Sequence, residues 1–193
     1  MGSQWGRDKT YLRAKYEGYR SRAAYKLLEL QQKFSIIRRD DNVVDLGAAP
    51  GSWLQVLRTL TDGKVLGVDL NTIAPIEGVE TIEGDLTDPV IQEQVVTMLG
   101  QVSVVVCDAS PKLSGHRSYD QARSVALGED ALQFACKVLK HGGNFVVKAF
   151  QGADFPELHA LAQQHFHAVK TYNTKSTRRG STEFYLIGKN FKG

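Results

Sequence analysis

Three carboxylates of this chain lie at positions where α/β proteins commonly bind a ligand. Each lies at or just after the end of an apolar run with the composition of a buried β-strand, and they are Asp69, Asp85 and Asp108. Ligands of α/β proteins bind beyond the carboxyl ends of parallel strands, where an acid commonly holds ribose hydroxyls. Asp69 lies twenty-two residues after Gly47, a suitable distance for that role. The three acids favour a nucleoside-containing cofactor, although any one of them alone is also compatible with a helix N-cap.

Lys148 interrupts the apolar run 145–150, whose sequence is Phe-Val-Val-Lys-Ala-Phe. An unpaired charge in a buried strand is costly, so this side chain needs a partner or a chemical purpose. A lysine titrates near ~10.4 in water, and it acts as a base at neutral pH only where burial or a nearby cation lowers its pKa. Lys148 is therefore a candidate base, or alternatively a group that steers the lone pair of a substrate hydroxyl.

The stretch 43–53 has the features needed to present a cofactor to these groups. Its sequence, Val-Val-Asp-Leu-Gly-Ala-Ala-Pro-Gly-Ser-Trp, predicts a buried strand, a tight turn and the start of a helix. Small residues let a ligand approach the backbone, and the helix N-terminus offers free N–H groups. The dinucleotide fingerprint G-x-G-x-x-G is absent, which disfavours a dehydrogenase. For the glycines alone, an ordinary α/β turn remains the alternative.

Predicted strands and helices alternate along the chain. The strands cover 43–46, 64–69, 80–83, 102–107, 144–150, 168–172 and 183–187. The helices cover 22–34, 54–60, 89–99, 121–140 and 154–166, with Ser21 as N-cap of the first and Gly142-Gly143 ending the fourth. This alternation predicts an α/β fold with a mostly parallel sheet and helices on both faces. Because only a short loop joins the last two strands, one of them is expected to run antiparallel.

Length and composition favour one domain, 1–193, in a reducing, cytoplasmic setting. No apolar run suits a membrane span or a signal peptide. The basic N-terminal segment, from about 5 to 26, carries seven cations against two acids, a charge of +5 in a chain of formal net charge +3. Four tyrosines are interleaved with these cations, as on a nucleic-acid surface. A solvated helical face with tyrosines docked on the core is the alternative.

Four stretches together resemble one family: 45–53 (Asp-Leu-Gly-Ala-Ala-Pro-Gly-Ser-Trp), 67–70 (Gly-Val-Asp-Leu), 84–85 (Gly-Asp) and 108–111 (Asp-Ala-Ser-Pro). They are similar in order and spacing to the FtsJ/RrmJ (RlmE-type) family of S-adenosylmethionine-dependent methyltransferases, which act on ribose 2′-hydroxyls of ribosomal RNA. The resemblance runs from about residue 19 to 189. It implies a Rossmann-like class I methyltransferase fold with a seven-stranded sheet, and S-adenosylmethionine as the cofactor.

The resemblance also implies the site residues. The family's catalytic Lys-Asp-Lys-Glu set falls on Lys26, Asp108, Lys148 and Glu183. Its cofactor contacts fall on Gly51, Trp53, Asp69, Asp85 and Asp108, and no metal is expected. The family often has a second glycine where this chain has Ser52, a residue that is also compatible with a helix start. The polar loops 112–118 and 175–181 are expected to help grip RNA, with simple exposed loops as the alternative.

By this resemblance, the expected reaction is methyl transfer to a ribose of RNA, with a uridine of large-subunit (23S) ribosomal RNA as the target. The alternatives are a tRNA anticodon-loop ribose methyltransferase and, in a different class, a noncatalytic RNA-binding or ribosome-assembly factor. The complete catalytic set disfavours the noncatalytic alternative. Methylation of base amino groups is disfavoured because no aromatic residue follows Asp108-Ala109-Ser110-Pro111. The expected partner is ribosomal RNA, within the assembled large subunit, and the expected state is a monomer without membrane contact.

One prediction follows from the N-terminal cations. If the segment 5–26 binds phosphates, RNA affinity falls steeply as salt is raised. Replacing Arg7, Lys9 and Arg13 together is expected to lower that salt slope and to leave cofactor affinity unchanged. Binding titrations at several salt concentrations check this, and a slope equal to that of the parent protein would mean that the segment is only a solvated face.

Overall fold

A seven-stranded sheet forms the centre of the protein, in a computed structural model that describes residues 9–111, 114–177 and 181–193. The strands are β1 (Val43–Leu46), β2 (Val65–Asp69), β3 (Glu80–Glu83), β4 (Val102–Cys107), β5 (Leu139–Phe150), β6 (Phe166–Tyr172) and β7 (Glu183–Phe191). Their order is β3-β2-β1-β4-β5-β7-β6. The pairs among β1 to β5 are parallel, whereas β7 runs antiparallel to both β5 and β6. The predicted α/β fold with one antiparallel strand near the C-terminus is confirmed.

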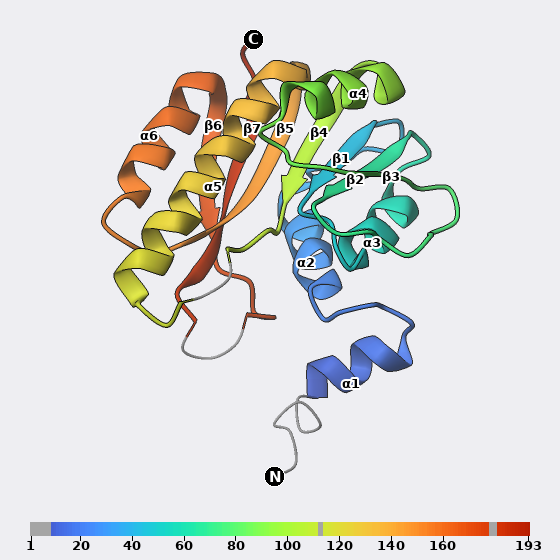
Figure 1. The fold of residues 1–193 in the computed structure, drawn as a ribbon, viewed down its shortest axis with the longest axis horizontal. Coiled ribbons are helices and arrows are strands. Elements are labelled where there is room, and N and C mark those ends of the chain that lie inside the picture. Colours follow the sequence, from blue (N-terminus) through green and yellow to red (C-terminus); the bar gives the residue numbers. More distant parts are fainter. Residues whose placement is uncertain (1–8, 112–113, 178–180) are drawn as a thin grey trace.

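Helices cover both faces of this sheet (Figure 1). They are α1 (Lys9–Tyr16), α2 (Ala24–Phe34), α3 (Ser52–Leu60), α4 (Pro89–Leu99), α5 (Arg117–Val138) and α6 (Phe155–His165). Apolar residues of α4, α5 and α6 pack on one face, and those of α2 and α3 pack on the other. The sheet is therefore the middle of three layers.

The alternation of side chains along the central strands decides which residues face α2 and α3. In β5, Phe145 and Val147 belong to the core under α4–α6, whereas Val146 belongs to the core under α2 and α3. Successive side chains of a strand point to opposite faces, so Lys148 lies on the α2–α3 side with Val146. By the same rule Glu183 shares a face with Tyr185, which is part of the α2–α3 core. Lys148 and Glu183 thus reach the same side from two neighbouring strands.

The turn after β1 is shaped by Gly47, whose φ is 69°. A Cβ atom at this position would lie 2.3 Å from the Cβ atom of Ala109, so the loops that follow β1 and β4 approach closely only because the side chain is absent. This contact brings the carboxyl ends of the two strands together, at the edge where ligands of α/β folds bind.

Several predicted boundaries differ from the structure. The helix α1 was not predicted, and α2 begins at Ala24 instead of residue 22. Ser21 does not cap α2: its Oγ accepts the N–H of Ala23 at 3.1 Å and pairs with the hydroxyl of Ser52 at 2.8 Å. The pair Gly142-Gly143 lies within β5, at a register shift opposite β4, and α5 already ends at Val138. A bulge in a strand uses glycine as readily as a helix end does, so sequence alone misassigned it.

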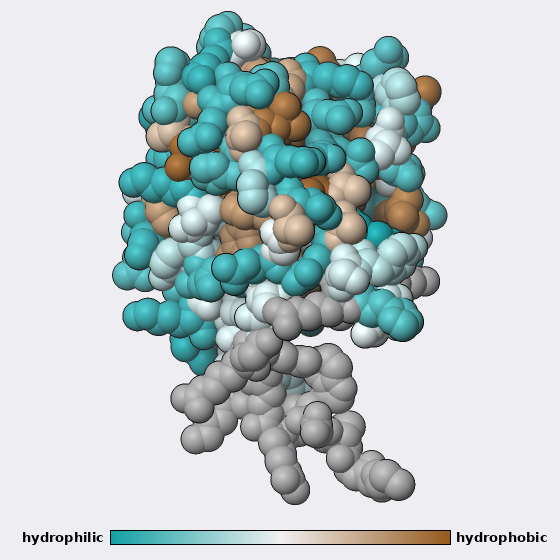
Figure 2. Space-filling model, turned by 90° about the vertical axis from the view of Figure 1, so that its left-hand side faces the viewer, coloured by the Kyte–Doolittle hydropathy of each residue, from teal (hydrophilic) through white to brown (hydrophobic). Residues whose placement is uncertain are grey.

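The surface of the described residues is mostly hydrophilic on the face seen in Figure 2, with apolar residues in separate small groups. No helix in the described ranges has both the length and the apolar composition that crossing a membrane requires.

Candidate active site

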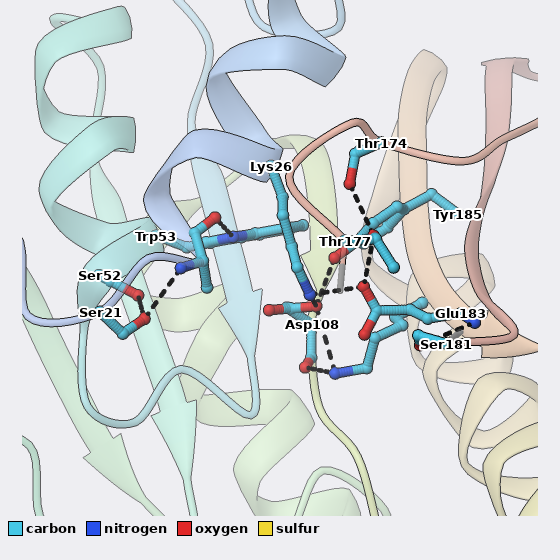
Figure 3. A network of polar contacts seen from close by, with 12 residues as sticks. Ser21, Lys26, Ser52, Trp53, Asp108, Thr174, Thr177, Ser181, Glu183 and Tyr185 are labelled. Carbon is cyan, nitrogen blue, oxygen red and sulfur yellow. Dashed lines mark hydrogen bonds and ion pairs between the residues drawn. The ribbon is translucent and has the colours of Figure 1, made fainter. Parts of the chain in front are cut away.

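Four charged side chains converge at the carboxyl edge of the sheet, on its α2–α3 side, and Figure 3 labels three of them, Lys26, Asp108 and Glu183. They are Lys26 of α2, Asp108 after β4, Lys148 of β5 and Glu183 at the start of β7. The Lys26 ammonium lies 2.5 Å from Glu183 Oε1 and 4.0 Å from Asp108 Oδ1. Lys148 Nζ lies 3.3 Å from the same Asp108 oxygen. The four residues implied by the resemblance thus form one cluster joined by three ion pairs.

Lys148 also donates a hydrogen bond of 2.5 Å to the backbone carbonyl of Asp108. Its nitrogen therefore faces two acceptors of one residue, the carbonyl and the carboxylate. A neutral amine has two N–H groups and one lone pair, so these contacts leave the lone pair of a neutral Lys148 available. The arrangement is compatible with either a base or a steering group at this position.

Sequence reasoning missed Tyr185, which completes the cluster. Its hydroxyl donates to Asp108 Oδ1 at 2.7 Å, and it lies opposite Lys148 in the β5–β7 pair. Its ring stacks on Trp53, with ring centroids 5.8 Å apart. Burial raises the pKa of Tyr185 well above its usual range, helped by the charges of Asp108 and Glu183, so the phenol is neutral. The available signal was its position two residues after Glu183, which places both side chains on one face.

The cluster is shielded from water. The side chains of its four charged residues are 8 to 16% exposed. Isolated charges at such sites are costly, and even paired ones contribute little net stability. Two ammonium groups facing two carboxylates therefore favour a chemical purpose over a purely structural one.

Two cavities meet at Asp108. The larger, of about 680 Å³, opens beyond the ends of β1, β2 and β4 and is lined by both Asp69 and Asp85. The smaller, of about 150 Å³, lies under the turn after β1 and is lined by Ser21, Ser52 and Trp53 among others. Because Asp108 lines both, a ligand filling the cavities would extend from the acids at the ends of β2 and β3 to the charged cluster.

Two of the predicted cofactor acids hold loops of the larger cavity. Asp69 accepts the N–H of Ala49 at 2.9 Å through Oδ2 and that of Asn71 at 2.8 Å through Oδ1. Asp85 uses Oδ1 to accept both the N–H and the hydroxyl of Thr87. The pKa of Asp130, which also lines the cavity, is raised by burial and by the charge of Asp85. An acidic wall of this kind suits hydrogen-bond donors of a ligand, such as ribose hydroxyls or an amino group.

Trp53 and Gly51, which the resemblance assigns to the cofactor, have evident structural functions. The indole of Trp53 is 2% exposed, and its Nε1–H donates to the carbonyl of Ala23, which fixes the start of α2 on α3. Gly51 has a φ of 101°, and a Cβ there would lie 2.7 Å from the guanidinium of Arg20. Gly51 does not line either cavity. Its backbone shapes the turn, while the neighbouring residues of that turn form the cavity walls.

Asp45 is a second residue that sequence reasoning missed. It is 1% exposed, and both of its carboxylate oxygens are without a hydrogen-bond partner among the described residues. It lines the smaller cavity. Burial raises the pKa of Asp45 well above its usual range, and the charges of Asp108 and Asp69 add to the shift. An orphaned carboxyl on a cavity wall fits a cationic ligand group, which would supply the missing donors.

The N-terminal cations fall into different structural classes. Arg20 donates to the carbonyls of Pro50 and Pro75, so its guanidinium fixes the turn after β1. Arg13 pairs with Glu17 on the surface, and Lys26 belongs to the charged cluster. Trp5 and Arg7 lie outside the described residues, as do residues 112–113 and 178–180 of the two predicted RNA loops.

Cys107 is a buried residue at the end of β4. Burial raises the pKa of Cys107 to about 12, as expected for a structural thiol and not for a nucleophile. Within the described ranges, no group of three or more His, Cys, Asp or Glu residues has a geometry that would hold a metal ion.

Residues 19–191 match the model of the FtsJ-like methyltransferase family. The chain belongs to this family. It is 75% identical over 193 residues to a protein of Methanoregula boonei, with all of both chains covered, and 66% identical to one of Methanosphaerula palustris, with 100% of this chain and 95% of the other covered. Both relatives are named ribosomal RNA large subunit methyltransferase E. The family resemblance of the four sequence stretches is confirmed.

Solved structures of methyltransferases share the fold of this FtsJ-like chain. A ribosomal RNA methyltransferase from Plasmodium falciparum superposes with a TM-score of 0.81 at 29% identity, covering 91% of this chain and 100% of the other. A methyltransferase from Streptococcus mutans superposes with a TM-score of 0.56 at 15% identity, covering 84% and 96% of the two chains. The predicted methyltransferase fold is confirmed.

The orphaned Asp45 generates a prediction about stability. The folded protein favours the neutral form of the Asp45 carboxyl. The resulting contribution to the free energy of unfolding is complete below the unfolded pKa of about 3.9, and it is lost as pH rises toward the raised folded pKa. The Asp45→Asn variant stays neutral, so we expect its free energy of unfolding to rise relative to the parent protein as pH increases from 4 to 8. Urea unfolding without cofactor measures this difference. The exposed Asp62→Asn variant is the control, and parallel curves for Asp45→Asn and the parent would contradict the assignment.

Proposed function

We propose that this protein transfers a methyl group from S-adenosylmethionine to a ribose 2′-hydroxyl of large-subunit ribosomal RNA. The observation that carries the proposal is the cluster of Lys26, Asp108, Lys148 and Glu183 beside a cavity lined by Asp69 and Asp85. Family membership and the names of the two archaeal relatives support the same reaction.

The cofactor would occupy the two cavities that meet at Asp108. Asp69 would accept the ribose hydroxyls and Asp85 would lie near the adenine, as the resemblance implies. The partnerless carboxyl of Asp45 in the smaller cavity fits the ammonium of the methionine half, because it would give each group a partner. When bound, S-adenosylmethionine supplies an electrophilic methyl group on a sulfonium.

The charged cluster prepares the RNA hydroxyl for transfer. An alcohol is a weak nucleophile, and positioning dominates an in-line displacement. Asp108 fixes Lys148 by both its carbonyl and its carboxylate, so the lysine nitrogen is held in one place. From there it accepts the hydroxyl proton, or directs the oxygen lone pair until the proton leaves. Lys26, held by Glu183, places a second positive charge beside this centre.

The target assignment follows the relatives' names, which favour large-subunit ribosomal RNA over the tRNA anticodon loop. In this proposal the chain acts as one monomeric methyltransferase domain, 1–193, in the cytoplasm, on an assembled large subunit, with the segment of about 5–26 as part of the RNA surface. Mapping ribose methylation in RNA from cells with and without the gene tests the target. Loss of one 2′-O-methyl group in large-subunit RNA is expected, whereas loss confined to tRNA, or no loss, would contradict the proposal.

The function of Lys148 can be tested directly. We expect Lys148→Ala to fold, to bind cofactor and RNA, and to lose at least on the order of 10²-fold in the rate of methyl transfer. Lys148→Arg is expected to restore little, because a guanidinium is not a base at neutral pH. Single-turnover assays at saturating cofactor and RNA measure the chemical step. Lys140→Ala, at an exposed position of the same strand, is the control, and a Lys148→Ala rate within a few-fold of the parent would refute the assignment.

The cofactor assignment predicts weaker binding in Asp69→Ala and Asp85→Ala. Each substitution removes an acceptor from the larger cavity, so calorimetry with S-adenosylmethionine is expected to show lower affinity. Asp62→Ala, whose carboxylate pairs with Arg39 outside both cavities, is the matched control. Unchanged affinity in both cavity variants, with folding intact, would remove Asp69 and Asp85 from the cofactor site.

A further inference from the structure

A further groove lies along α2, the helix that also carries Lys26 of the charged cluster. It measures about 510 Å³ and is lined by residues of α1, α2 and the chain that follows β6. Among them are Arg13, Lys33 and Lys175, together with the rings of Tyr25 and Tyr172. Lys33 Nζ stands 4.3 Å from the ring centroid of Tyr172. This groove is separate from both cavities assigned to the cofactor.

The carboxylate in this groove is already used for hydrogen bonds. Glu29 accepts the hydroxyl of Tyr172 at 2.8 Å and the backbone N–H of Lys175 at 3.0 Å. It thereby fixes the chain after β6 against α2, and among the described residues it pairs with no lysine ammonium. Two exposed lysines, Lys33 and Lys175, therefore face the groove with one acid between them, and that acid is satisfied by other donors.

Positive charge continues along the edge of the sheet. Lys170 lies two residues before Tyr172 in the edge strand β6, so both side chains lie on the α2 side. Lys189 of β7 donates to the last carbonyls of α2, those of Phe34 and Ser35. Lys189 lies opposite Ala168, so it is a diagonal neighbour of Lys170 across the β6–β7 pair. Burial lowers the pKa of Lys189, and the charges of Arg38 and Lys170 lower it further. Asp41 accepts the backbone N–H of Arg38 at 2.8 Å.

We propose that the cationic strip formed by Lys175, Lys33, Lys170, Lys189 and Arg38 binds the phosphates of the RNA strand that leads to the catalytic cluster. This inference rests on the proposed RNA methylation and assigns the path of the substrate over the protein.

The geometry of the strip fits a nucleic-acid strand. Lys189 lies opposite Ala168, four residues before Tyr172, which gives about 13 Å of strand at ~3.3 Å per residue. That length corresponds to about four stacked nucleotides at ~3.4 Å each. Lysines spaced along it would bind the backbone without reading the bases.

The strip is also continuous with the catalytic cluster. Lys175 is two residues before Thr177, whose hydroxyl donates to Glu183 Oε1 at 3.2 Å. On the other side, α2 carries Lys33 toward its end and Lys26 near its start, and Lys26 pairs with Glu183. A strand bound along the strip would therefore arrive at the cluster guided by α2 and the chain after β6.

The test replaces Lys33, Lys170 and Lys175 together by glutamine. Affinity for a labelled 20-nucleotide single-stranded RNA is expected to fall on the order of 10²-fold at ~0.1 M salt, and the salt slope to fall by about 2. The control replaces three exposed lysines outside the strip, Lys64, Lys137 and Lys140, and is expected to bind like the parent. Affinity for S-adenosylmethionine and the single-turnover rate at saturating RNA are expected to stay unchanged in both variants.

Equal affinity in the two triple variants would overturn the inference. Loss of affinity for large ribosomal subunits without loss for the short RNA would also overturn it, since the strip would then contact a ribosomal protein. If the triple variant fails to fold, Lys170→Glu on the exposed edge strand provides the same comparison. If the parent protein methylates RNA and the triple variant binds RNA as well as the parent does, only the strip is refuted. If the parent protein does not methylate RNA, the proposed function is refuted.

Discussion

The site depends on the position of one carboxylate, that of Asp108. It follows the central strand β4 and meets Tyr185 and both lysines through a single oxygen. Those three donors come from α2, β5 and β7, so each of these elements must end or begin at the same edge of the sheet. The antiparallel direction of β7 makes this possible, because Glu183 starts the strand opposite Phe150, where β5 ends. A parallel strand would place its first residue at the far edge.

This arrangement places four charges where water is largely excluded. Stability does not explain them, since buried ion pairs roughly offset their own desolvation cost. The same low exposure strengthens electrostatic interactions with a bound substrate. The same argument applies to Asp45, because a buried carboxyl without hydrogen-bond partners lowers the stability of the ligand-free protein. Both features become understandable if a ligand with its own donors and charges completes them.

The sequence supported good predictions where one physical signal dominates. The strands β1 and β4 and the helix α4 were predicted to the residue, because a buried β-branched run marks each strand and a proline marks the helix start. The four residues that the resemblance assigned to one set also lie together in the structure. Tyr185 and Asp45 were missed because their partners, or lack of partners, arise only from the packing of distant segments. The glycines at 142 and 143 were misassigned because a helix end and a strand bulge use the same residue.

The N-terminal cations illustrate why charge counting does not locate a binding surface. The sequence grouped Arg20 with the RNA-binding cations, yet its guanidinium fixes the turn after β1, and Lys26 pairs with Glu183 in the charged cluster that the resemblance implied. Cations from α2, β6, β7 and the chain after β6 lie far apart in the sequence but along one edge in the fold. Folding thus buries part of the basic N-terminal charge. It also forms a basic surface from residues that are not neighbours in the sequence. A strand of RNA responds to that surface potential, so its path follows the fold and not the clustering of lysine and arginine in the sequence.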